Sequence, residues 1–266
     1  MNASILYNEK LSPGYYRMGI RWPASSVVPG QFVMLRVCEG LDPLLRRPFG
    51  VYDVLGQGRP GPGGGFSADG IDLVYRVVGR GTAIMSEKSA GEPVDVLGPL
   101  GVGFPPPDDP ARAVLVGGGM GVVPLHLFAR TLPGAALLFG TRSAREAAVA
   151  DAFSRDLKLG RLEIVTEDGS SGRKGLVTDL LREVLSPDSV VYACGPPAML
   201  KAVAGAAAEG RVKCFVSLER TMACGIGVCL GCAVKTSGRR RELKAYSMVC
   251  SDGPVFDGRD IDWELF

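Results

Sequence analysis

Short apolar runs alternate with turns rich in glycine and proline along the first hundred or so residues. Runs of this length, with many β-branched and aromatic residues, are typical of antiparallel strands. The pattern predicts a small β-barrel or sandwich over residues 1–104, and the glycine-rich stretch 58–70 predicts the tip of a hairpin. The clearest runs are residues 26–38, 49–55, 71–79 and 91–101.

The pattern changes after a proline-rich linker at residues 103–112. Four apolar stretches follow, and each leads through a turn into a segment with helical periodicity, the second of these at residues 143–157. Repeated strand–helix units imply a parallel sheet covered by helices, so residues 105–212 are expected to form an α/β domain. Residues 213–266 are rich in cysteine and contain no long helical pattern, which indicates a small third domain.

The composition is that of a globular protein, with 46% hydrophobic and 22% charged residues. A net charge of +2 is too small for general binding to nucleic acid or to an anionic membrane. No stretch approaches the ~20 consecutive apolar residues that a membrane span needs, and the first ten residues contain no long apolar leader. We therefore expect a cytoplasmic protein that binds neither nucleic acid nor membranes.

The chain has one histidine and seven cysteines. A single histidine excludes three-histidine zinc sites, two-histidine Rieske clusters and the metalloprotease motifs that need two histidines. An odd number of cysteines, without a leader segment, argues against a disulfide framework. Because four of the seven cysteines fall between residues 224 and 250, they need a joint explanation.

Cys224, Cys229, Cys232 and Cys250 have the spacing Cys-x4-Cys-x2-Cys with a distant fourth cysteine. Plant-type [2Fe–2S] proteins use this spacing, because a tight loop wraps one edge of the cluster and a separate segment closes it. The loop CGIGVCLGC also contains glycines whose backbone N–H groups could approach the sulfides. Two alternatives stay open. One is a four-cysteine zinc site, which usually pairs two Cys-x2-Cys knuckles, and the other is a set of unrelated buried cysteines.

A second candidate site is the glycine-rich turn that follows the apolar strand at residue 113. The turn does not match Gly-x-Gly-x-x-Gly; it contains Gly118, Gly119, Gly121 and Pro124. Such a turn lets a phosphate approach the backbone at the positive end of a helix, which suits a dinucleotide pyrophosphate. An ordinary tight turn is the alternative.

The fourth strand of the α/β region ends in Cys194, Gly195 and Pro196. This is the carboxyl edge of the expected sheet, where open α/β sheets bind their ligands. Cys194 could therefore face a nicotinamide ring, whereas an isolated cysteine is otherwise a small buried residue.

The β-rich region contains the sequence Arg46-Arg47-Pro48-Phe49-Gly50. An arginine there could hold a pyrophosphate and the phenylalanine could stack on a flat ring, although a solvated turn is the alternative. Thr82 begins an apparent helix and could present N–H groups to phosphate. His126 is interpreted as a packed or partly exposed helix residue, and the arginines at 239–241 as a solvated hairpin.

The order of these motifs resembles the ferredoxin–NADP reductase superfamily, in which a flavin-binding barrel precedes a nicotinamide-binding domain. The cysteine-rich region narrows the resemblance to the electron-transfer subunits of class 1B dihydroorotate dehydrogenase. The resemblance covers essentially the whole chain and implies an FAD-binding β-barrel over residues 1–104, an NAD-binding α/β domain over 105–212 and a [2Fe–2S] domain over 213–266. The most similar segments are residues 44–49, 75–82, 96–104, 217–234 and 248–263.

The resemblance also implies which residues hold each group. The four cysteines would ligate the cluster, and Phe49 would stack on the isoalloxazine ring of FAD. The dinucleotide would lie on the glycine-rich turn, with Cys194, Gly195 and Pro196 beside the nicotinamide. FAD would contact Arg47, Pro48, Phe49, Gly50, Val74, Tyr75, Arg76, Gly81 and Thr82. The chain departs from the family at Gly50, where a serine or threonine hydroxyl usually reaches flavin N5.

The function that the resemblance implies is electron transfer in pyrimidine biosynthesis. An FMN-containing dihydroorotate dehydrogenase subunit, in a two-plus-two heterotetramer, would send electrons through the cluster and FAD to NAD⁺. No side chain of this chain needs to act as a general base in that scheme. The alternatives are a reductase subunit that serves a hydrogenase or a ferredoxin-dependent transhydrogenase, and a zinc-stabilised interaction module without catalysis.

The residue pattern does not decide between NAD and NADP. Arg142 follows the second strand of the α/β region, where it could meet a 2′-phosphate, which favours NADP. Glu167 and Asp168, after the third strand, do not settle the question. The resemblance favours NAD.

Overall fold

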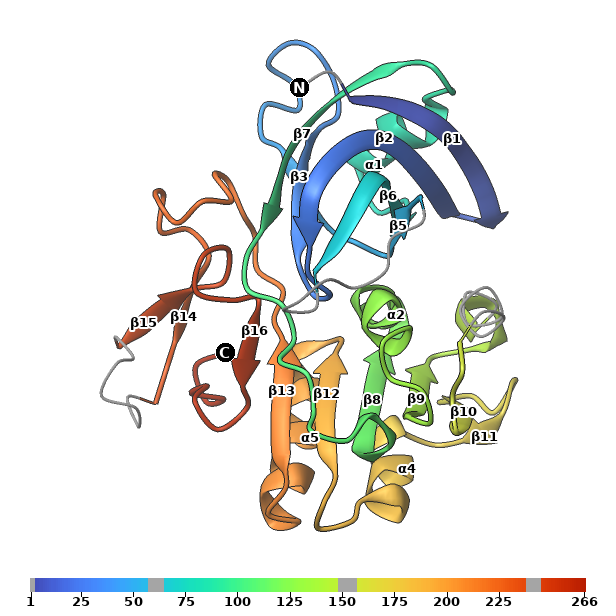
Figure 1. Ribbon diagram of the computed structural model, residues 1–266, viewed down its shortest axis with the longest axis vertical. Coiled ribbons are helices and arrows are strands. Elements are labelled where there is room, and N and C mark those ends of the chain that lie inside the picture. Colours follow the sequence, from blue (N-terminus) through green and yellow to red (C-terminus); the bar gives the residue numbers. More distant parts are fainter. Residues whose placement is uncertain (1–2, 57–64, 148–156, 238–244) are drawn as a thin grey trace.

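The computed structural model describes residues 3–56, 65–147, 157–237 and 245–266. They form two seven-stranded sheets and a small two-stranded sheet. Figure 1 shows the curled sheet of the N-terminal residues above the parallel sheet, with the C-terminal segment beside both.

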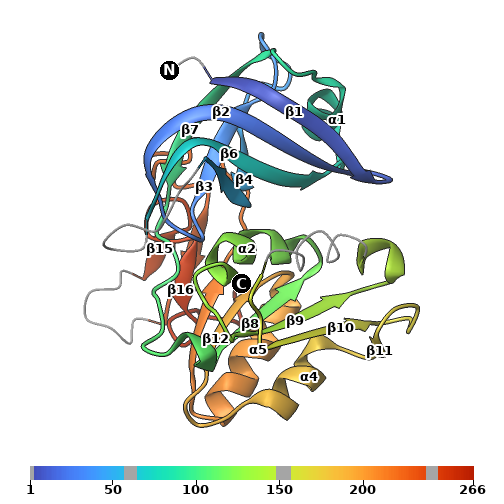
Figure 2. The same ribbon diagram turned by 45° about the vertical axis from the view of Figure 1, so that its right-hand side comes forward.

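The first sheet is antiparallel and strongly curled, as both views show (Figures 1 and 2). Its two longest strands pair with register shifts, and such irregularities let long strands bend around one core. Helix α1 (Arg80–Glu87) follows its sixth strand. In spatial order the strands are β4 (Arg47–Gly50), β3 (Phe32–Arg36), β7 (Pro93–Leu100), β1 (Ala3–Ser12), β2 (Tyr15–Val27), β6 (Phe66–Arg76) and β5 (Asp53–Leu55).

The second sheet contains six parallel strands and one antiparallel edge strand. The expected α/β architecture is therefore confirmed, and β13 and β16, which follow the expected division at residue 212, both join this sheet. In spatial order the strands are β11 (Arg173–Lys174), β10 (Arg161–Thr166), β9 (Ala136–Thr141), β8 (Ala113–Gly118), β12 (Val190–Cys194), β13 (Lys213–Ser217) and β16 (Val255–Asp257).

Helices cover both faces of the parallel sheet (Figure 2). Val114 and Val116 of β8 pack on the side of α4 (Val177–Val184) and α5 (Pro197–Glu209), whereas Leu115 packs on the side of α2 (Val123–Ala129). Strands buried on both faces are continuous apolar runs, which is why the sequence pattern identified them. Single 3₁₀ turns at Pro110–Arg112 and Gly119–Val122 precede β8 and α2.

Helix α2 joins the two sheets. His126, which is 4% exposed, stacks on Tyr52 with ring centroids 4.0 Å apart, and its Nε2 lies 3.4 Å from the Asp53 carboxylate. Arg130 forms an ion pair with the same carboxylate. At the start of the helix, Pro124 packs so closely on Gly50 that a Cβ at residue 50 would lie 2.9 Å from the proline ring. The orientation of the two sheets is thus fixed by polar and apolar contacts together.

The remaining C-terminal residues form a loop after β13 and a small hairpin of β14 (Ala233–Lys235) and β15 (Tyr246–Met248). The loop packs on the curled sheet at Gly225, where φ is +76° and a Cβ would lie 2.7 Å from Met34. Only glycine meets both requirements easily, because it has no side chain to clash and adopts positive φ without strain.

Two sequence expectations need correction. Of the expected hairpin tip at 58–70, residues 57–64 lie outside the described residues, but Phe66 already begins β6 and is buried. Pairing with β2 and burial outweigh the local glycine content there.

Helix α1 begins at Arg80, not Thr82, and the Thr82 hydroxyl accepts from the Val78 N–H at 2.9 Å. Most of the helix expected at 143–157, and the arginines at 239–241, lie outside the described residues.

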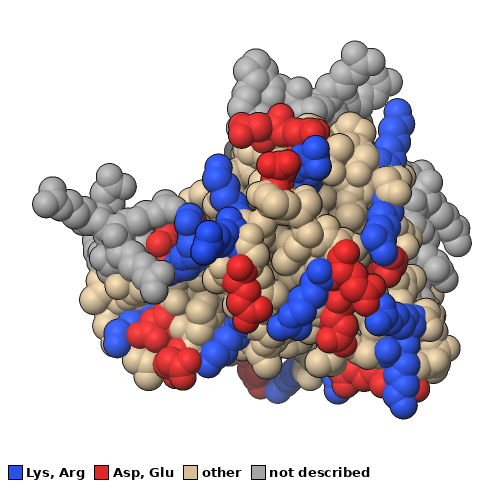
Figure 3. All heavy atoms as spheres, turned by 90° about the horizontal axis from the view of Figure 1, so that it is seen from below, with Lys and Arg blue, Asp and Glu red and all other residues tan. Residues whose placement is uncertain are grey.

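Charges of both signs are mixed on the end of the molecule that lies farthest from the curled sheet (Figure 3). This distribution agrees with the small net charge of +2. Among the described residues, no helix combines the length and the apolar character that would be needed to cross a membrane.

Candidate functional site

Three adjoining cavities lie where the two sheets and the C-terminal loop meet, with volumes of about 500, 460 and 510 Å³. The first, which runs along the carboxyl ends of the parallel strands, we call the groove. The second, between Pro48 and Thr221, is the central cavity. The third, against the curled sheet, is the upper cavity. Sequence reasoning placed candidate residues on all three, and the structure brings these residues together.

The upper cavity is lined by all nine residues that the resemblance assigned to FAD. The Phe49 ring lies edge-on to the ring of Tyr75, with centroids 6.1 Å apart. Tyr75 is 2% exposed and donates its hydroxyl to Asn8 Oδ1 at 2.9 Å, and burial raises the pKa of that hydroxyl. The buried Tyr75 therefore anchors the wall of the cavity. The Phe49 ring, packed edge-on against Tyr75, gives this wall an aromatic surface.

Arginines line the upper cavity at the start of helix α1. Arg47 lies so close to Gly81 that a Cβ there would be 3.2 Å from the arginine Nε. Glycine at 81 therefore leaves room for the guanidinium next to the first turn of the helix. Arg76 and Arg80 line the same wall and are ion-paired with Glu146 and Asp42 respectively. A cavity with Arg47 at the first turn of a helix and an aromatic ring suits a dinucleotide with a flat ring, as FAD has.

The groove contains Gly118, Gly119 and Gly121 of the turn after β8. A Cβ at Gly121 would lie 2.2 Å from the carbonyl oxygen of Cys194, and a Cβ at Gly118 would lie 2.4 Å from the Met199 sulfur. At Gly119, where φ is +52°, a Cβ would meet nothing within 4 Å. Gly121 thus lets the turn pack on the end of β12, and Gly118 lets it pack on Pro196 and the first turn of α5. Gly119 faces open space where a phosphate can approach the backbone.

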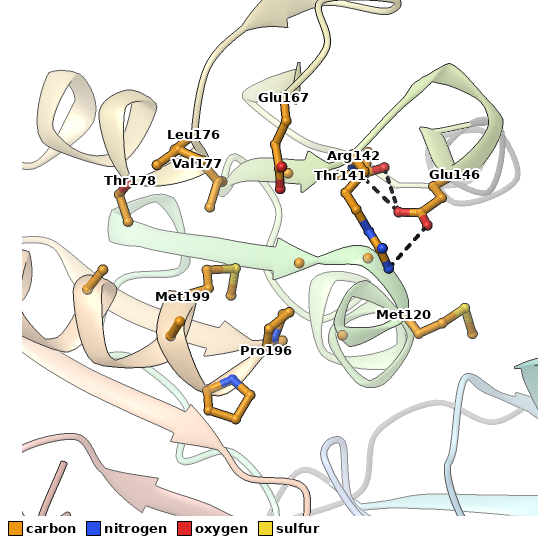
Figure 4. A pocket seen from close by; sticks show the side chains of 18 of the residues that line it. Met120, Thr141, Arg142, Glu146, Glu167, Leu176, Val177, Thr178, Pro196 and Met199 are labelled. Atoms are coloured by element: carbon orange, nitrogen blue, oxygen red, sulfur yellow. Dashed lines mark hydrogen bonds and ion pairs between the residues drawn. The ribbon is translucent and has the colours of Figure 1, made fainter. Parts of the chain in front are cut away.

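The segment after β12 forms the opposite wall of the groove. Gly195 and Pro196 line the groove (Figure 4). Pro124, at the start of α2, lines both the upper and the central cavities. Cys194 lines the central cavity and is 1% exposed, and burial raises the pKa of its thiol well above the usual range. Cys194 is therefore a neutral thiol at this junction rather than a reactive thiolate.

Glu219 is a residue that the sequence reasoning missed. It lines the groove, the central cavity and the upper cavity, which no other described residue does. Its side chain is open to the cavities but surrounded by protein on most sides, and this desolvation raises the pKa of the carboxyl above its usual value. The available signal was its position, two residues after strand β13, at the sheet edge where α/β folds bind ligands.

The four cysteines of the C-terminal loop gather as two pairs. The Sγ atoms of Cys232 and Cys250 lie 3.3 Å apart, and the Sγ of Cys224 accepts the N–H of Cys229 at 3.4 Å. Among the residues that the structure describes, no group of three or more ligand side chains is placed to share one ion. Two cysteine pairs are the arrangement that a [2Fe–2S] cluster requires, with one pair on each iron.

Backbone donors point at these sulfurs. Ile226 N–H donates to Cys224 Sγ at 3.4 Å and Gly227 N–H to Cys250 Sγ at 3.1 Å. The hydrogen bonds to Cys224 lower the pKa of its thiol to about 6, so it is readily available as a thiolate ligand. The donor set therefore fits a cluster held by four thiolates.

Apolar side chains surround the exposed Cys229. Ile226 is 53%, Val228 75% and Leu230 63% exposed, although all three are residues that proteins usually bury. Exposed apolar residues next to a candidate redox centre are a feature of a protein contact surface. We call these three residues the cluster face.

Comparisons with known proteins follow the same division of the chain. Residues 219–262 match a family model described as the iron-sulfur cluster binding domain of dihydroorotate dehydrogenase B. The chain is 36% identical over 261 residues to a protein of Caldanaerobacter subterraneus subsp. tengcongensis named dihydroorotate dehydrogenase B (NAD(+)), electron transfer subunit, and 98% of each chain is covered. A Geobacillus thermodenitrificans protein of the same name is 42% identical over 244 residues, which covers 88% of this chain and 86% of that protein.

Among solved structures, an NADH-dependent reduced ferredoxin-NADP oxidoreductase is similar over 100% of this chain and 91% of its own, with a TM-score of 0.79 and 30% identity.

Replacing Arg47 with alanine removes a cation from the upper cavity. We expect the Kd for FAD to rise about 10- to 100-fold, because a hydrogen bond to a charged group contributes ~1.5–3 kcal/mol. Flavin content after gel filtration and fluorescence titration with FAD would measure this. Arg161→Ala is the control, since Arg161 pairs with Glu163 on β10, away from the cavities. Equal flavin retention in both variants would contradict a role for Arg47.

Replacing Glu219 with glutamine should stabilise the protein in a pH-dependent way. The carboxyl pKa is raised in the folded state, so ionisation of Glu219 opposes folding at pH values above its ordinary pKa. The melting temperature of Glu219→Gln should exceed that of the wild type at about pH 8, and the gain should vanish by about pH 3, where the carboxyl is protonated in both the folded and the unfolded state. A gain that is the same at both pH values would contradict this assignment.

Proposed function

The chain belongs to the electron transfer subunits of NAD-dependent dihydroorotate dehydrogenase B, and on this premise we propose that it passes electrons from an FMN-containing catalytic subunit to NAD⁺. The catalytic subunit removes two electrons and two protons from dihydroorotate to give orotate, a step of pyrimidine biosynthesis. NAD⁺ takes up two electrons and one proton as hydride, and the second proton goes to solvent. The chain thus needs sites for FAD, a [2Fe–2S] cluster and NAD⁺.

The observation that carries the proposal is the meeting of three cavities at Glu219, five residues before Cys224. Bound FAD supplies the conversion between single-electron exchange and hydride transfer, which neither an iron–sulfur cluster nor a nicotinamide can perform alone. The nine residues assigned to FAD, all of which line the upper cavity, would hold it. Pro48, Gly50 and Pro124, which line both this cavity and the central cavity, form the passage.

The groove orients the dinucleotide. Gly119 offers its backbone to the pyrophosphate, and the turn at Gly195 and Pro196 leads from the groove toward the central cavity. The nicotinamide then lies on the side of Glu219, where the groove and the flavin cavities meet. At Gly50, where the family usually has a hydroxyl, packing against Pro124 takes the space that a side chain would need.

Cys224, Cys229, Cys232 and Cys250 would hold the cluster, which would exchange single electrons with the flavin and the catalytic subunit. The loop packs on Met34 of the curled sheet through Gly225, which keeps the cluster near the flavin-binding wall. On the outer side, the exposed apolar residues of the cluster face bind the FMN-containing partner. Two copies of each subunit form the assembly, and the complex acts in the cytoplasm.

A second candidate function has specific support. One of the similar solved structures is that of an NADH-dependent reduced ferredoxin-NADP oxidoreductase, with 30% identity over the whole of this chain. In that case the same cavities and cluster would serve a different partner, with NADH as the electron source. The two functions differ in the partner and the direction of electron flow, not in this chain's own sites.

Absorbance spectra of the co-expressed complex distinguish the two functions. We expect dihydroorotate, added without oxygen, to bleach the flavin and cluster bands of this subunit when the FMN-containing subunit is present, and NADH to bleach them in either case. Bleaching by NADH alone, with the FMN subunit bound, would favour the ferredoxin-linked alternative. A chain that carries no flavin or cluster absorbance would exclude both functions.

Replacing Cys229 with serine should separate the two halves of the pathway. Loss of a thiolate ligand should abolish the electron paramagnetic resonance signal of the reduced cluster and slow dihydroorotate-dependent NAD⁺ reduction at least about 100-fold. Reduction of ferricyanide by NADH should stay within about twofold of wild type, because the flavin and dinucleotide cavities contain no part of Cys229. Cys38→Ser, at a half-buried cysteine outside the loop, is the matched control. Loss of both activities in Cys229→Ser alone would contradict separate sites.

A further inference from the structure

One end of the groove holds a carboxylate with several partners. Glu146 accepts the Thr141 hydroxyl at 3.1 Å and the backbone N–H of Arg142 at 3.4 Å through Oε2. Its other oxygen, Oε1, lies 3.7 Å from the Arg142 guanidinium and 3.5 Å from that of Arg76. Figure 4 shows Glu146 and Arg142 side by side at the end of β9. Glu146 therefore lies beside Arg142, the residue that the sequence pattern placed near a 2′-phosphate.

The order of the strands identifies this end of the groove. Strand β8, with the glycine-rich turn, lies between β12 and β9. The β12 side leads to Glu219 and the flavin cavities, so it takes the nicotinamide half of the dinucleotide. The adenylate half then lies on the β9 side, where α/β dinucleotide sites read the ribose 2′-position.

The charges at this end do not favour a second phosphate. Two arginines and three glutamates line the groove, and both arginines, Arg142 and Arg76, pair with Glu146. Glu167 adds another carboxylate to the lining of this groove. Its backbone N–H donates to the Thr141 carbonyl at 3.0 Å, which holds it next to the end of β9. A 2′-phosphate carries about −1.5 to −2 charges and needs an arginine that is available to it. A ribose hydroxyl carries no charge and needs no arginine.

We propose that Glu146 makes the groove select NAD over NADP, by engaging Arg142 and Arg76 and by repelling a 2′-phosphate. This inference rests on the proposed function, because it concerns the dinucleotide that the groove binds. Glu146 is a specificity-determining residue in this scheme. The arginine that the sequence suggested as a mark of NADP binding is neutralised by a carboxylate four residues later.

Binding of the adenylate half tests the proposal without relying on the flavin. Isothermal titration calorimetry with 5′-AMP and adenosine 2′,5′-bisphosphate should show that wild-type protein prefers 5′-AMP. In Glu146→Gln the ratio of the two Kd values should shift at least about tenfold toward the bisphosphate, which corresponds to about 1.4 kcal/mol. The ratio of kcat/KM for NADPH and NADH, with ferricyanide as acceptor, should shift in the same direction.

Three variants make the result specific. Glu146→Asp keeps the charge and should keep the wild-type preference, and Glu163→Gln removes a carboxylate from β10 outside the groove and should change nothing. Adding Arg142→Ala to Glu146→Gln should cancel at least half of the gain in bisphosphate affinity. A wild-type protein that prefers the bisphosphate, or an unchanged ratio in Glu146→Gln, would overturn the proposal.

Failure of the proposed function would look different. A wild-type chain that binds 5′-AMP more tightly than the bisphosphate, but whose flavin is reduced by neither NADH nor NADPH, would support the role of Glu146 and contradict electron transfer to NAD⁺.

Discussion

The site depends on close contacts at two glycines, between segments far apart in the sequence. At Gly121 a Cβ would lie 2.2 Å from the Cys194 carbonyl oxygen, and at Gly50 it would lie 2.9 Å from Pro124. The first contact brings together the turns that follow β8 and β12. The second seats helix α2 on the curled sheet, beside the upper cavity. A side chain at Gly121 would push two backbone segments apart, and one at Gly50 would require the Pro124 ring to shift, so the common junction of the three cavities is most sensitive to Gly121.

Carboxylates around this junction serve opposite purposes. Glu219 is held in a desolvated position that raises its pKa, an arrangement that costs stability and is common at functional sites. Glu146 is satisfied by a hydroxyl, a backbone N–H and two guanidinium groups, so it stabilises the end of β9 and the contact with Arg76 of the curled sheet. Hydrogen bonds and ion pairs thus hold the carboxylate at the β9 end of the groove, whereas ionisation of the carboxylate is disfavoured where the three cavities meet.

Much of the architecture could be predicted because each pattern had a local cause. The alternation of turns and short strands, the four strand–helix units and the cysteine spacing identified the curled sheet, the parallel sheet and the cluster loop. The predictions were weakest where pairing between distant segments outweighs local composition. Phe66 lies next to a glycine-rich stretch, yet β2 draws it into the core, and α1 begins at Arg80 because Thr82 turns its hydroxyl back on the preceding loop.

The sequence by itself determined which chemistry the chain can support: four cysteines at iron–sulfur spacing, a glycine-rich turn after a buried strand, and an arginine–aromatic pair before another. Those signals are local, since each depends on residues close together in the chain or on their spacing. Only the tertiary structure decided that Glu219 lies at the junction of the three cavities and that Glu146 neutralises Arg142 and Arg76. Electrostatic effects depend on distance and burial, and both are set by contacts between strands that the sequence places far apart.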